Sequence, residues 1–327
     1  MGRRRIHLGE RTLVMGVLNV TPDSFSDGGL YLDANRAIEH GLEMAAQGAD
    51  WIDVGGESTR PGSKPIPADE ELRRVLPVIR GLSSKLRKLR QRAAISIDTT
   101  KAEVAEQAVR AGASIINDVS GLRFDPRVAD VARRHRTVLV LMHLRGRPET
   151  MQQGPFARSI WRSLPPGLAR SVRQALDSCV RRSQLIIDPG LGFGKTRRQN
   201  FQILAGLDRL RRFRLPILIG ASRKSFVQAI VAGEGLNPSR PRKARANYWA
   251  LTSSGMRAGV GSGESEVGTR VPLLLGDAAA AVAAILAGAH VVRVHDVAGI
   301  IPAVRLADAV LQTGARGQGS GARDHSL

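Results

Sequence analysis

Short apolar runs recur along the chain, and each is followed by a segment with helical periodicity. The runs are continuous rather than alternating, which is typical of parallel strands that are buried on both faces. The expected strands are Thr12–Asn19, Trp51–Val54, Ala94–Asp98, Ile115–Asp118, Val138–His143, Leu185–Asp188, Ile217–Gly220 and His290–His295. Eight strands that alternate with helices predict an α/β fold with a parallel sheet.

The segments between these runs carry apolar residues three and four positions apart, as helices that cover a sheet do. We expect Asp33 to cap the first helix, and Thr100 with Glu103 has the spacing of a capping box. Asp277 begins an Ala-rich helical pattern that ends at Gly288. Further helical patterns run near Asp69–Leu89, Pro126–Arg134, Leu168–Arg182, Arg198–Arg212, Lys224–Ala232 and Ala298–Gln312.

A Gly-Ala pair precedes three of the expected strands, at Gly48-Ala49, Gly112-Ala113 and Gly288-Ala289. Each glycine can end a helix, and five positions later a polar residue stands near the end of the strand. The same helix-to-strand corner is therefore used three times. This repeat and the eight units predict a single TIM-type (β/α)8 barrel.

The barrel is expected to cover residues 12–312, after an N-terminal lead of residues 1–11. Residues 233–272 are rich in Gly, Ser and Arg and lie between two helical patterns, so we interpret them as an insertion before the last strand. Residues 313–327 are predicted to be a flexible tail, because they are largely Gly-rich and polar.

Composition narrows the class of protein. Cys179 is the only cysteine, which excludes an intrachain disulfide and fits a reducing, cytoplasmic compartment. The sequence has no uninterrupted apolar stretch of about 18 residues, so no membrane span is expected. The net charge of +20 admits a nucleic-acid binder. However, the basic residues are spread over several expected helices and aromatic residues make up only 4%, so we expect a solvated basic surface and no nucleic-acid partner.

Polar residues stand at the end of every expected strand, where barrel enzymes have their active sites. They are Asn19, Asp53, Asp98, Asn117, His143, Asp188, the Ser222-Arg223-Lys224 group, Arg293 and His295. Any one of them alone is more simply explained as a structural polar residue. Such residues at essentially every strand end predict a binding site.

The chemistry of these residues divides in two. Asp98, Asn117, Asp188 and Lys224 offer acceptors, amide donors and a cation that can read the edge of a flat heterocycle. Arg293, His295 and Asn19 suit an anion and a hard metal such as Mg²⁺. These three converge if the barrel closes, because the last and first strands are then neighbours.

Three loops carry further signals. The stretch 21–29, which includes Phe25 and Asp27, and the stretch 57–62 mix charge with Gly and Pro, as loops that close over a substrate do. An ordinary solvated loop fits either stretch as well. Residues 190–196 are similar to a P-loop, but the spacing from Gly190 to Gly194 is one residue too short, which favours a tight turn.

Together these motifs resemble the dihydropteroate synthase family. The matching stretches are MGVLNVTPDSFSDGG (15–29), DVGGESTRPG (53–62), SIDT (96–99), INDVSG (116–121), Met142-His143, IDPGLGFGK (187–195), ASRKSF (221–226) and RVHDV (293–297). They occur in the family's order over most of residues 12–312. The resemblance implies a transferase that joins 4-aminobenzoate to 6-hydroxymethyl-dihydropterin diphosphate and releases diphosphate.

The resemblance also implies a role for each matching position. Asp98, Asn117, Asp188 and Lys224 match the pterin-binding set, and Asn19, Arg293 and His295 match the diphosphate and Mg²⁺ set. Thr59, Arg60 and Ser225 match positions near the diphosphate and the aminobenzoate, whose pocket Phe25, Phe193 and Lys224 would wall. Asp98, Lys224, Arg293 and His295 would be the catalytic residues.

The segment 233–272 is longer than is usual in the family, which commonly dimerises through late helices near it. The resemblance therefore leaves a homodimer open. Besides the synthase, two other hypotheses for the function stay open. A methyltransferase domain that binds a methylated folate would keep the pterin groups, but it would need neither the motif at 15–29 nor the Arg293–His295 pair. The other hypothesis is a non-catalytic paralogue, or a basic binding protein on a barrel scaffold.

Overall fold

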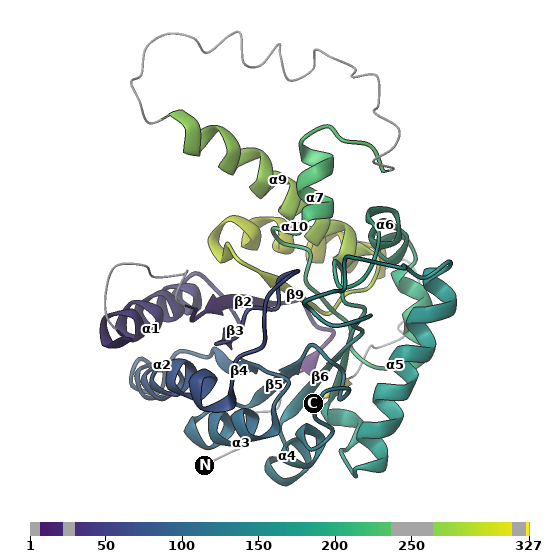
Figure 1. Ribbon diagram of the computed structural model, residues 1–327. Helices are drawn as coiled ribbons and strands as arrows, with labels where there is room; N and C mark the ends of the chain where they lie inside the picture. Colours follow the sequence, from purple (N-terminus) through teal and green to yellow (C-terminus); the bar gives the residue numbers. More distant parts are fainter. Residues whose placement is uncertain (1–6, 22–29, 237–263, 316–324, 327) are drawn as a thin grey trace.

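A computed structural model describes residues 7–21, 30–236, 264–315 and 325–326 (Figure 1). The strands are β1 (His7–Leu8), β2 (Leu13–Asn19), β3 (Trp51–Gly55), β4 (Ala94–Asp98), β5 (Ile115–Asp118), β6 (Val138–Met142), β7 (Leu185–Asp188), β8 (Leu218–Ile219), β9 (Val291–Val294) and β10 (His325–Ser326). The helices are α1 (Leu30–Ala46), α2 (Ala68–Lys88), α3 (Ala102–Ala111), α4 (Val128–His135), α5 (Ile160–Asp177), α6 (Arg197–Ala205), α7 (Ser225–Val231), α9 (Glu264–Leu286) and α10 (Val297–Ala315). Two short 3-10 helices, Arg182–Gln184 and Leu207–Phe213, flank β7 and α6.

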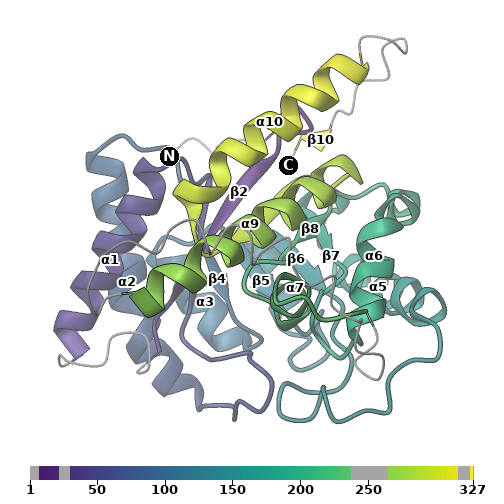
Figure 2. The same cartoon turned by 90° about the horizontal axis from the view of Figure 1, so that it is seen from above.

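Eight of the strands form one parallel sheet in the order β7-β6-β5-β4-β3-β2-β9-β8. A single parallel bridge between Ile187 and Ile217 joins the two outer strands. The sheet is thus a nearly closed barrel, and its helices form the outer ring, as Figure 2 shows from above. The predicted (β/α)8 barrel is confirmed, and each of the eight strands lies where the apolar runs predicted it.

The Gly-Ala corners have the geometry that was expected of them. Gly48, Gly112 and Gly288 have φ angles of +107°, +129° and +109°, which residues with a Cβ rarely adopt. The following alanine N–H then donates to a carbonyl five residues back, at 2.9 Å from Ala49 to Met44 and 3.0 Å from Ala113 to Ala108. This is the bond pattern of a glycine-terminated helix, and it turns the chain directly into the next strand.

Several helix starts differ from the prediction. Helix α1 begins at Leu30, so Asp33 is inside it. At α3 the N-cap is Lys101, with no side-chain cap bond, and the Asp125 carboxylate instead accepts the N–H of Ala102 at 2.9 Å. Helix α9 already begins at Glu264, within the segment predicted as an insertion, and residues 237–263 of that segment lie outside the described residues.

The chain ends also differ from the prediction. Helix α10 continues to Ala315, three residues past the expected barrel boundary. Within the expected lead and tail, β1 pairs antiparallel with β10. Leu8 of β1 is 1% exposed and packs among apolar residues from the starts of the barrel strands. This ribbon therefore lies at the N-terminal end of the barrel, away from the strand ends that carry the polar residues.

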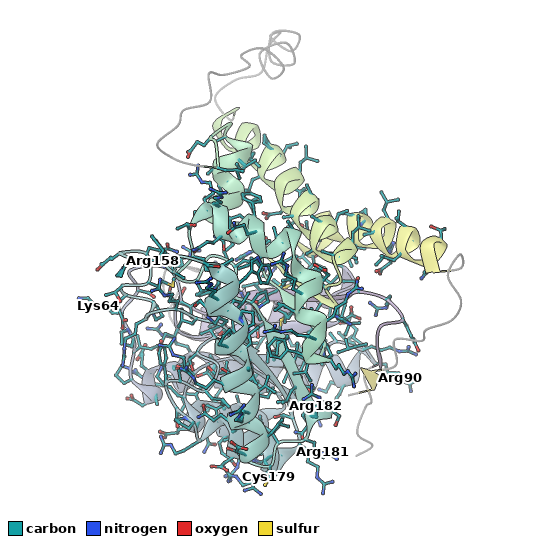
Figure 3. All side chains as sticks on the ribbon, turned by 90° about the vertical axis from the view of Figure 1, so that its right-hand side faces the viewer. Lys64, Arg90, Arg158, Cys179, Arg181 and Arg182 are labelled. Atoms are coloured by element: carbon teal, nitrogen blue, oxygen red, sulfur yellow. The ribbon has the colours of Figure 1, made fainter. Side chains whose placement is uncertain are left out.

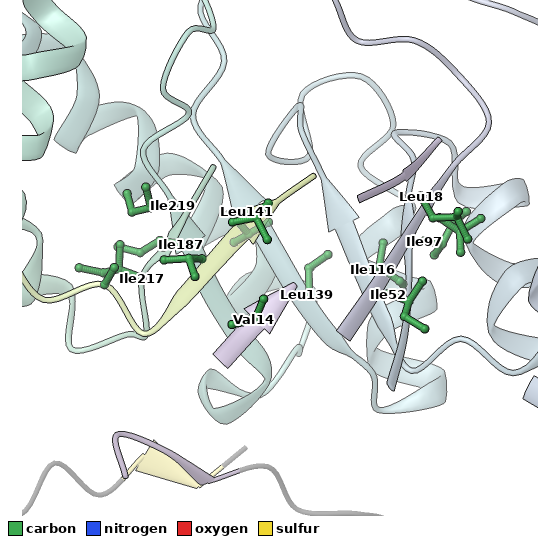
Figure 4. Close-up of a cluster of buried hydrophobic side chains, with 14 of the residues drawn as sticks. Val14, Leu18, Ile52, Ile97, Ile116, Leu139, Leu141, Ile187, Ile217 and Ile219 are labelled. Carbon is green, nitrogen blue, oxygen red and sulfur yellow. The ribbon is translucent and has the colours of Figure 1, made fainter. Parts of the chain in front are cut away.

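The main core lies between the strands and the ring of helices. Figure 4 shows its strand layer, with outward-facing residues such as Val14, Ile52 and Ile116. A second cluster, which includes Met15, Trp51 and Ile115, fills the barrel interior near its N-terminal end. Burial of each large apolar side chain stabilises the fold by about 1.5–3 kcal/mol. The two layers hold the strands rigidly, so their C-terminal ends can serve as a fixed platform.

The described surface carries an apolar pair of helices and an exposed cysteine. Helices α9 and α10 pack together and expose apolar side chains, with Leu275 57% and Leu306 66% exposed. Of the described helices, one stretch, residues 297–314, could cross a membrane by length and composition alone, and 22% of it is buried. Cys179, which is exposed, lies in the turn between α5 and β7, far from these helices (Figure 3).

Candidate active site

Four strand ends stand side by side in one layer of the barrel. Asn19 of β2 is paired with Gly55 of β3, Gly55 with Asp98 of β4, and Asp98 with Asn117 of β5. A Cβ at Gly55 would lie 3.8 Å from Asn19 Oδ1 and 3.6 Å from the Asp98 Cβ. The glycine therefore leaves a gap between the Asn19 amide and the Asp98 carboxylate.

Arg293 of β9 reaches across the first strands of the barrel to two of these neighbouring strands, β3 and β4. Its Nε donates to Asp53 Oδ2 at 2.7 Å and its Nη2 to Asp98 Oδ2 at 2.9 Å. Asn117 Nδ2 donates to the same Asp53 oxygen at 2.9 Å. Two buried carboxylates thus share one guanidinium, whose Nη1 has no hydrogen-bond partner among the described residues. The guanidinium is thus paired with two carboxylates of the protein, and the role of Arg293 toward a diphosphate stays a prediction.

Burial and the neighbouring Asp53 carboxylate raise the pKa of Asp98, and the charge of Arg293 opposes this shift. Burial also raises the pKa of Asp188 to about 6, because an ionised carboxylate loses its hydration inside the barrel. Asp188 ends β7, and its Oδ1 accepts the N–H of Gly190 at 2.7 Å. Both groups can change protonation state near neutral pH, which is frequent at functional sites.

Lys224, just before α7, lies beside the turn that follows β7. Its Nζ is 3.9 Å from the ring centroid of Phe193, a cation–π contact. Burial and the charge of Arg293 lower the pKa of Lys224 to about 8, while Asp188 and Asp98 oppose this shift. Lys224 therefore lies close to both Phe193 and Asp188.

The turn itself is held by Lys195, which is buried. Its ammonium donates to the carbonyls of His143, Gly190 and Phe193, at 2.9, 2.7 and 2.9 Å. Every N–H of the ammonium is therefore used within the protein. The stretch 190–196 is a tight turn and not a phosphate loop, in agreement with its spacing.

His295 follows β9 and is held by Ser222. Its Nδ1 is 3.2 Å from Ser222 Oγ, which in turn donates to Asp277 Oδ2 at 2.7 Å. Burial and the nearby charge of Arg293 lower the pKa of His295 to about 3, so the imidazole is neutral at physiological pH. The Ser222–Asp277 pair escaped the sequence interpretation, because Asp277 was taken as a helix start and lies 55 residues from Ser222.

The remaining predicted residues lie on loops around this centre. Thr59 and Arg60 are in the β3–α2 loop, and Ser225 is the exposed first residue of α7. The charge of Arg60 contributes to the lowered pKa of His295, so Arg60 is electrostatically coupled to the strand ends. Phe25 and Asp27 lie outside the described residues. Asp53 is two residues before the end of β3, and only the three-dimensional pairing reveals it as the link between Arg293 and Asn117.

The sequence of the chain is similar to those of known proteins. Residues 15–295 match the family described as pterin binding enzyme. A dihydropteroate synthase of Synechocystis is 38% identical over 310 residues, which cover 95% of this chain and 94% of the relative. The chain belongs to the dihydropteroate synthase family. A synthase of this family from Mycobacterium leprae is 39% identical over 302 residues, covering 92% of this chain and 94% of that protein.

Solved structures of dihydropteroate synthases agree with the fold. The Xanthomonas albilineans enzyme with 4-aminobenzoic acid superposes with a TM-score of 0.73 at 36% identity, covering 92% of this chain and 93% of the other. The Yersinia pestis enzyme in a sulfonamide drug complex gives 0.75 at 33% identity, covering 94% and 100%. The family membership predicted from the motifs is confirmed, and the chain is an enzyme of this family.

Proposed function

We propose that this enzyme transfers the pterin-methyl group of 6-hydroxymethyl-7,8-dihydropterin diphosphate to 4-aminobenzoate, giving 7,8-dihydropteroate and diphosphate. One observation carries the proposal: buried acceptors at three strand ends, Asp98, Asn117 and Asp188, lie beside the cations Arg293 and Lys224. Such a site can bind a flat, hydrogen-bonding ring at one end and an anionic leaving group at the other.

The pterin end is assigned to Asp98, Asn117, Asp188 and Lys224. A pterin presents ring N–H and amino donors along one edge and a carbonyl acceptor beside them. Carboxylates and an amide match the donors, and an ammonium matches the acceptor. Because the side chains of Asp98, Asn117 and Asp188 are buried, a ring that lacks the partner groups would leave them unpaired, which penalises analogues.

The diphosphate end is assigned to Arg293, His295 and Asn19. Arg293 has an edge that the two aspartates leave open. The charge of a bound diphosphate would favour protonated His295, which can donate from Nε2 while Nδ1 stays with Ser222. The described residues contain no cluster of three or more His, Cys, Asp or Glu side chains for a metal. A Mg²⁺ ion on a diphosphate needs only one or two protein oxygens, so Asn19 Oδ1 beside Gly55 fits this role.

When bound there, Mg²⁺ would supply positive charge against the leaving diphosphate. The bond between the methylene carbon and the phosphate oxygen breaks, and its electron pair leaves with diphosphate, which Arg293 and His295 hold. The Asp98 carboxylate stabilises the positive charge that develops on the pterin methylene. The aniline nitrogen then forms the new C–N bond with its lone pair and releases a proton to water.

The aminobenzoate is assigned to the side of the site that Phe193 and Lys224 wall, with Thr59, Arg60 and Ser225 on the surrounding loops. The 3.9 Å contact of the Lys224 ammonium with the Phe193 ring fixes both groups in one place. In the stretch 21–29, Phe25 and Asp27 are assigned to a loop that covers the substrates and excludes water, which would otherwise compete as the nucleophile.

The test is an assay of purified protein with the pterin diphosphate, 4-aminobenzoate and Mg²⁺, in which dihydropteroate and diphosphate are both measured. We expect equal amounts of the two products, loss of turnover when EDTA removes Mg²⁺, and recovery when Mg²⁺ is added back. Folded protein that forms no product above background would contradict the proposal. Methyl transfer from a methylated folate, in the absence of this activity, would favour the methyltransferase reading.

We infer further that the enzyme is a cytoplasmic homodimer, as its single cysteine and its apolar outer helices suggest. Val271, Leu275 and Leu306 expose apolar side chains on the packed pair α9 and α10, and a second copy would cover them. Light scattering should give twice the mass of the chain, and Leu306→Glu should shift the protein toward the monomer, whereas Leu89→Glu on the far side should not. A wild-type monomer at micromolar concentration would contradict this inference.

A further inference from the structure

Three charged residues from three different elements meet beside the β3–α2 loop, residues 56–67. The Lys101 ammonium, at the start of α3, lies 2.6 Å from Glu71 Oε2 of α2. The same ammonium also pairs with the Glu57 carboxylate, at the base of the loop. We call Glu57, Lys101 and Glu71 the loop-base cluster. It links the loop to the two helices that flank β4.

The cluster has a rigid end and a loop end. Glu71 is fully buried, so its carboxylate depends on Lys101 for compensation. Gly56 packs against the same helix so closely that a Cβ there would lie 2.7 Å from Val75 Cγ1. Lys101 is held in place by its ion pair with the buried Glu71, and Glu57 is held in place by its ion pair with Lys101.

Glu57 in turn closes the base of the loop. Its Oε2 accepts the N–H of Ile66 at 3.2 Å, which brings the two ends of the loop together. At the tip, the N–H of Gly62 donates to the carbonyl of Pro148 at 3.1 Å, and Ser63 Oγ donates to the carbonyl of Arg60 at 2.7 Å. The segment that carries Thr59 and Arg60 is thus held between a charged base and a backbone contact.

We propose that Glu57 is a positioning residue, which acts through Lys101 and Ile66 to hold Thr59 and Arg60 over the strand ends. The proposal rests on the proposed function, because it assigns these two residues to the substrates. Glu57 lines a cavity of about 350 Å³ whose lining includes none of Asp98, Asn117, Asp188 or Arg293, so it acts from outside the reaction centre. Its effect on catalysis comes only from the position of the loop.

Glu57→Ala separates loop position from folding, because it leaves the Lys101–Glu71 pair intact. We expect the KM for 4-aminobenzoate to rise by about tenfold or more, with a smaller change in kcat, since misplaced binding groups weaken substrate capture. Glu57→Gln keeps an oxygen that can accept from Lys101 and Ile66, so it should restore most of the KM. Glu39→Ala, an exposed glutamate on α1, should behave like the wild type.

Hydrogen exchange tests the loop without reference to turnover. In Glu57→Ala the peptide that covers residues 58–66 should exchange faster than in the wild type, and in Glu57→Gln it should not. Unchanged exchange in Glu57→Ala would overturn the inference, even if the wild type proved inactive. Faster exchange with an unchanged KM would overturn the positioning role. A wild type without turnover would contradict the proposed function alone, and the exchange result would still decide whether Glu57 holds the loop.

Discussion

Replacement of Arg293 by alanine is expected to lower kcat by about 100-fold or more, the loss typical when a group that stabilises developing negative charge is removed. The same change also leaves Asp53 and Asp98 buried without a cation. Breaking a buried ion pair in this way costs about 3–5 kcal/mol of the free energy of unfolding. The assay must therefore be run at a temperature at which circular dichroism shows the variant to be folded.

The two effects of Arg293→Ala separate with pH. Burial and Asp53 raise the folded-state pKa of Asp98 above the value of about 4 found in unfolded chains, and Arg293 opposes this shift. Without Arg293 the pKa rises further, so the folded state binds its proton more tightly. The resulting stabilisation is complete below pH of about 4 and is lost as the pH rises through the folded-state pKa. Urea unfolding should therefore show a smaller deficit of the variant at pH 5 than at pH 8.

Two controls complete the experiment. Arg293→Lys keeps a positive charge but cannot donate to both aspartates as a planar fork, so it should recover part of the stability and little of the rate. Arg173→Ala removes an exposed arginine of α5 and should change neither. A rate within twofold of the wild type in Arg293→Ala would refute the role assigned to Arg293.

Lys195→Met is expected to destabilise the fold by about 2–6 kcal/mol, because the buried carbonyls of His143 and Phe193 lose their donor and each such loss costs about 1–3 kcal/mol. The third carbonyl, that of Gly190, keeps the N–H of Phe193 as a donor at 3.2 Å, and the three carbonyls together join the end of β6 to the turn after β7. Methionine has a similar length, so the comparison isolates the ammonium. The free energy of unfolding from urea titration is the measurement, with Lys88→Met, an exposed position on α2, as the matched control. Equal stability of the two variants would show that the carbonyls find other donors.

Much of the barrel could be predicted from the sequence because its strands are short, apolar and buried on both faces. The corners at Gly48, Gly112 and Gly288 were visible because glycine marks a positive φ. The same corner occurs at Arg90, with φ of +53°, where the N–H of the next residue also donates five residues back, to Leu86. Arg136 and Cys179 repeat it, with φ of +54° and +61°. Without glycine no local signal distinguishes these corners, because tertiary packing imposes the conformation.

The residues of the site could be predicted from the sequence, but the hydrogen bonds and ion pairs between them could not. Asp98, Asn117, Asp188 and Arg293 were found because polar residues at the ends of apolar runs are conspicuous. That Arg293 binds Asp53 and Asp98 depends on strand register, which joins residues 240 and 195 positions apart. The loop-base cluster escaped notice for a similar reason, since a buried glutamate in a charged helix is indistinguishable in sequence from its exposed neighbours.

Cys179 is a site at which the enzyme can be labelled selectively. It is the only cysteine of the sequence, it is exposed, and it precedes β7 at the end of the barrel opposite the strand ends. A maleimide reagent would therefore modify the native chain at one known point without any substitution. Protein attached through this thiol to a sensor chip would have a single orientation, with the C-terminal end of the barrel, where the candidate active site lies, facing the flowing solution.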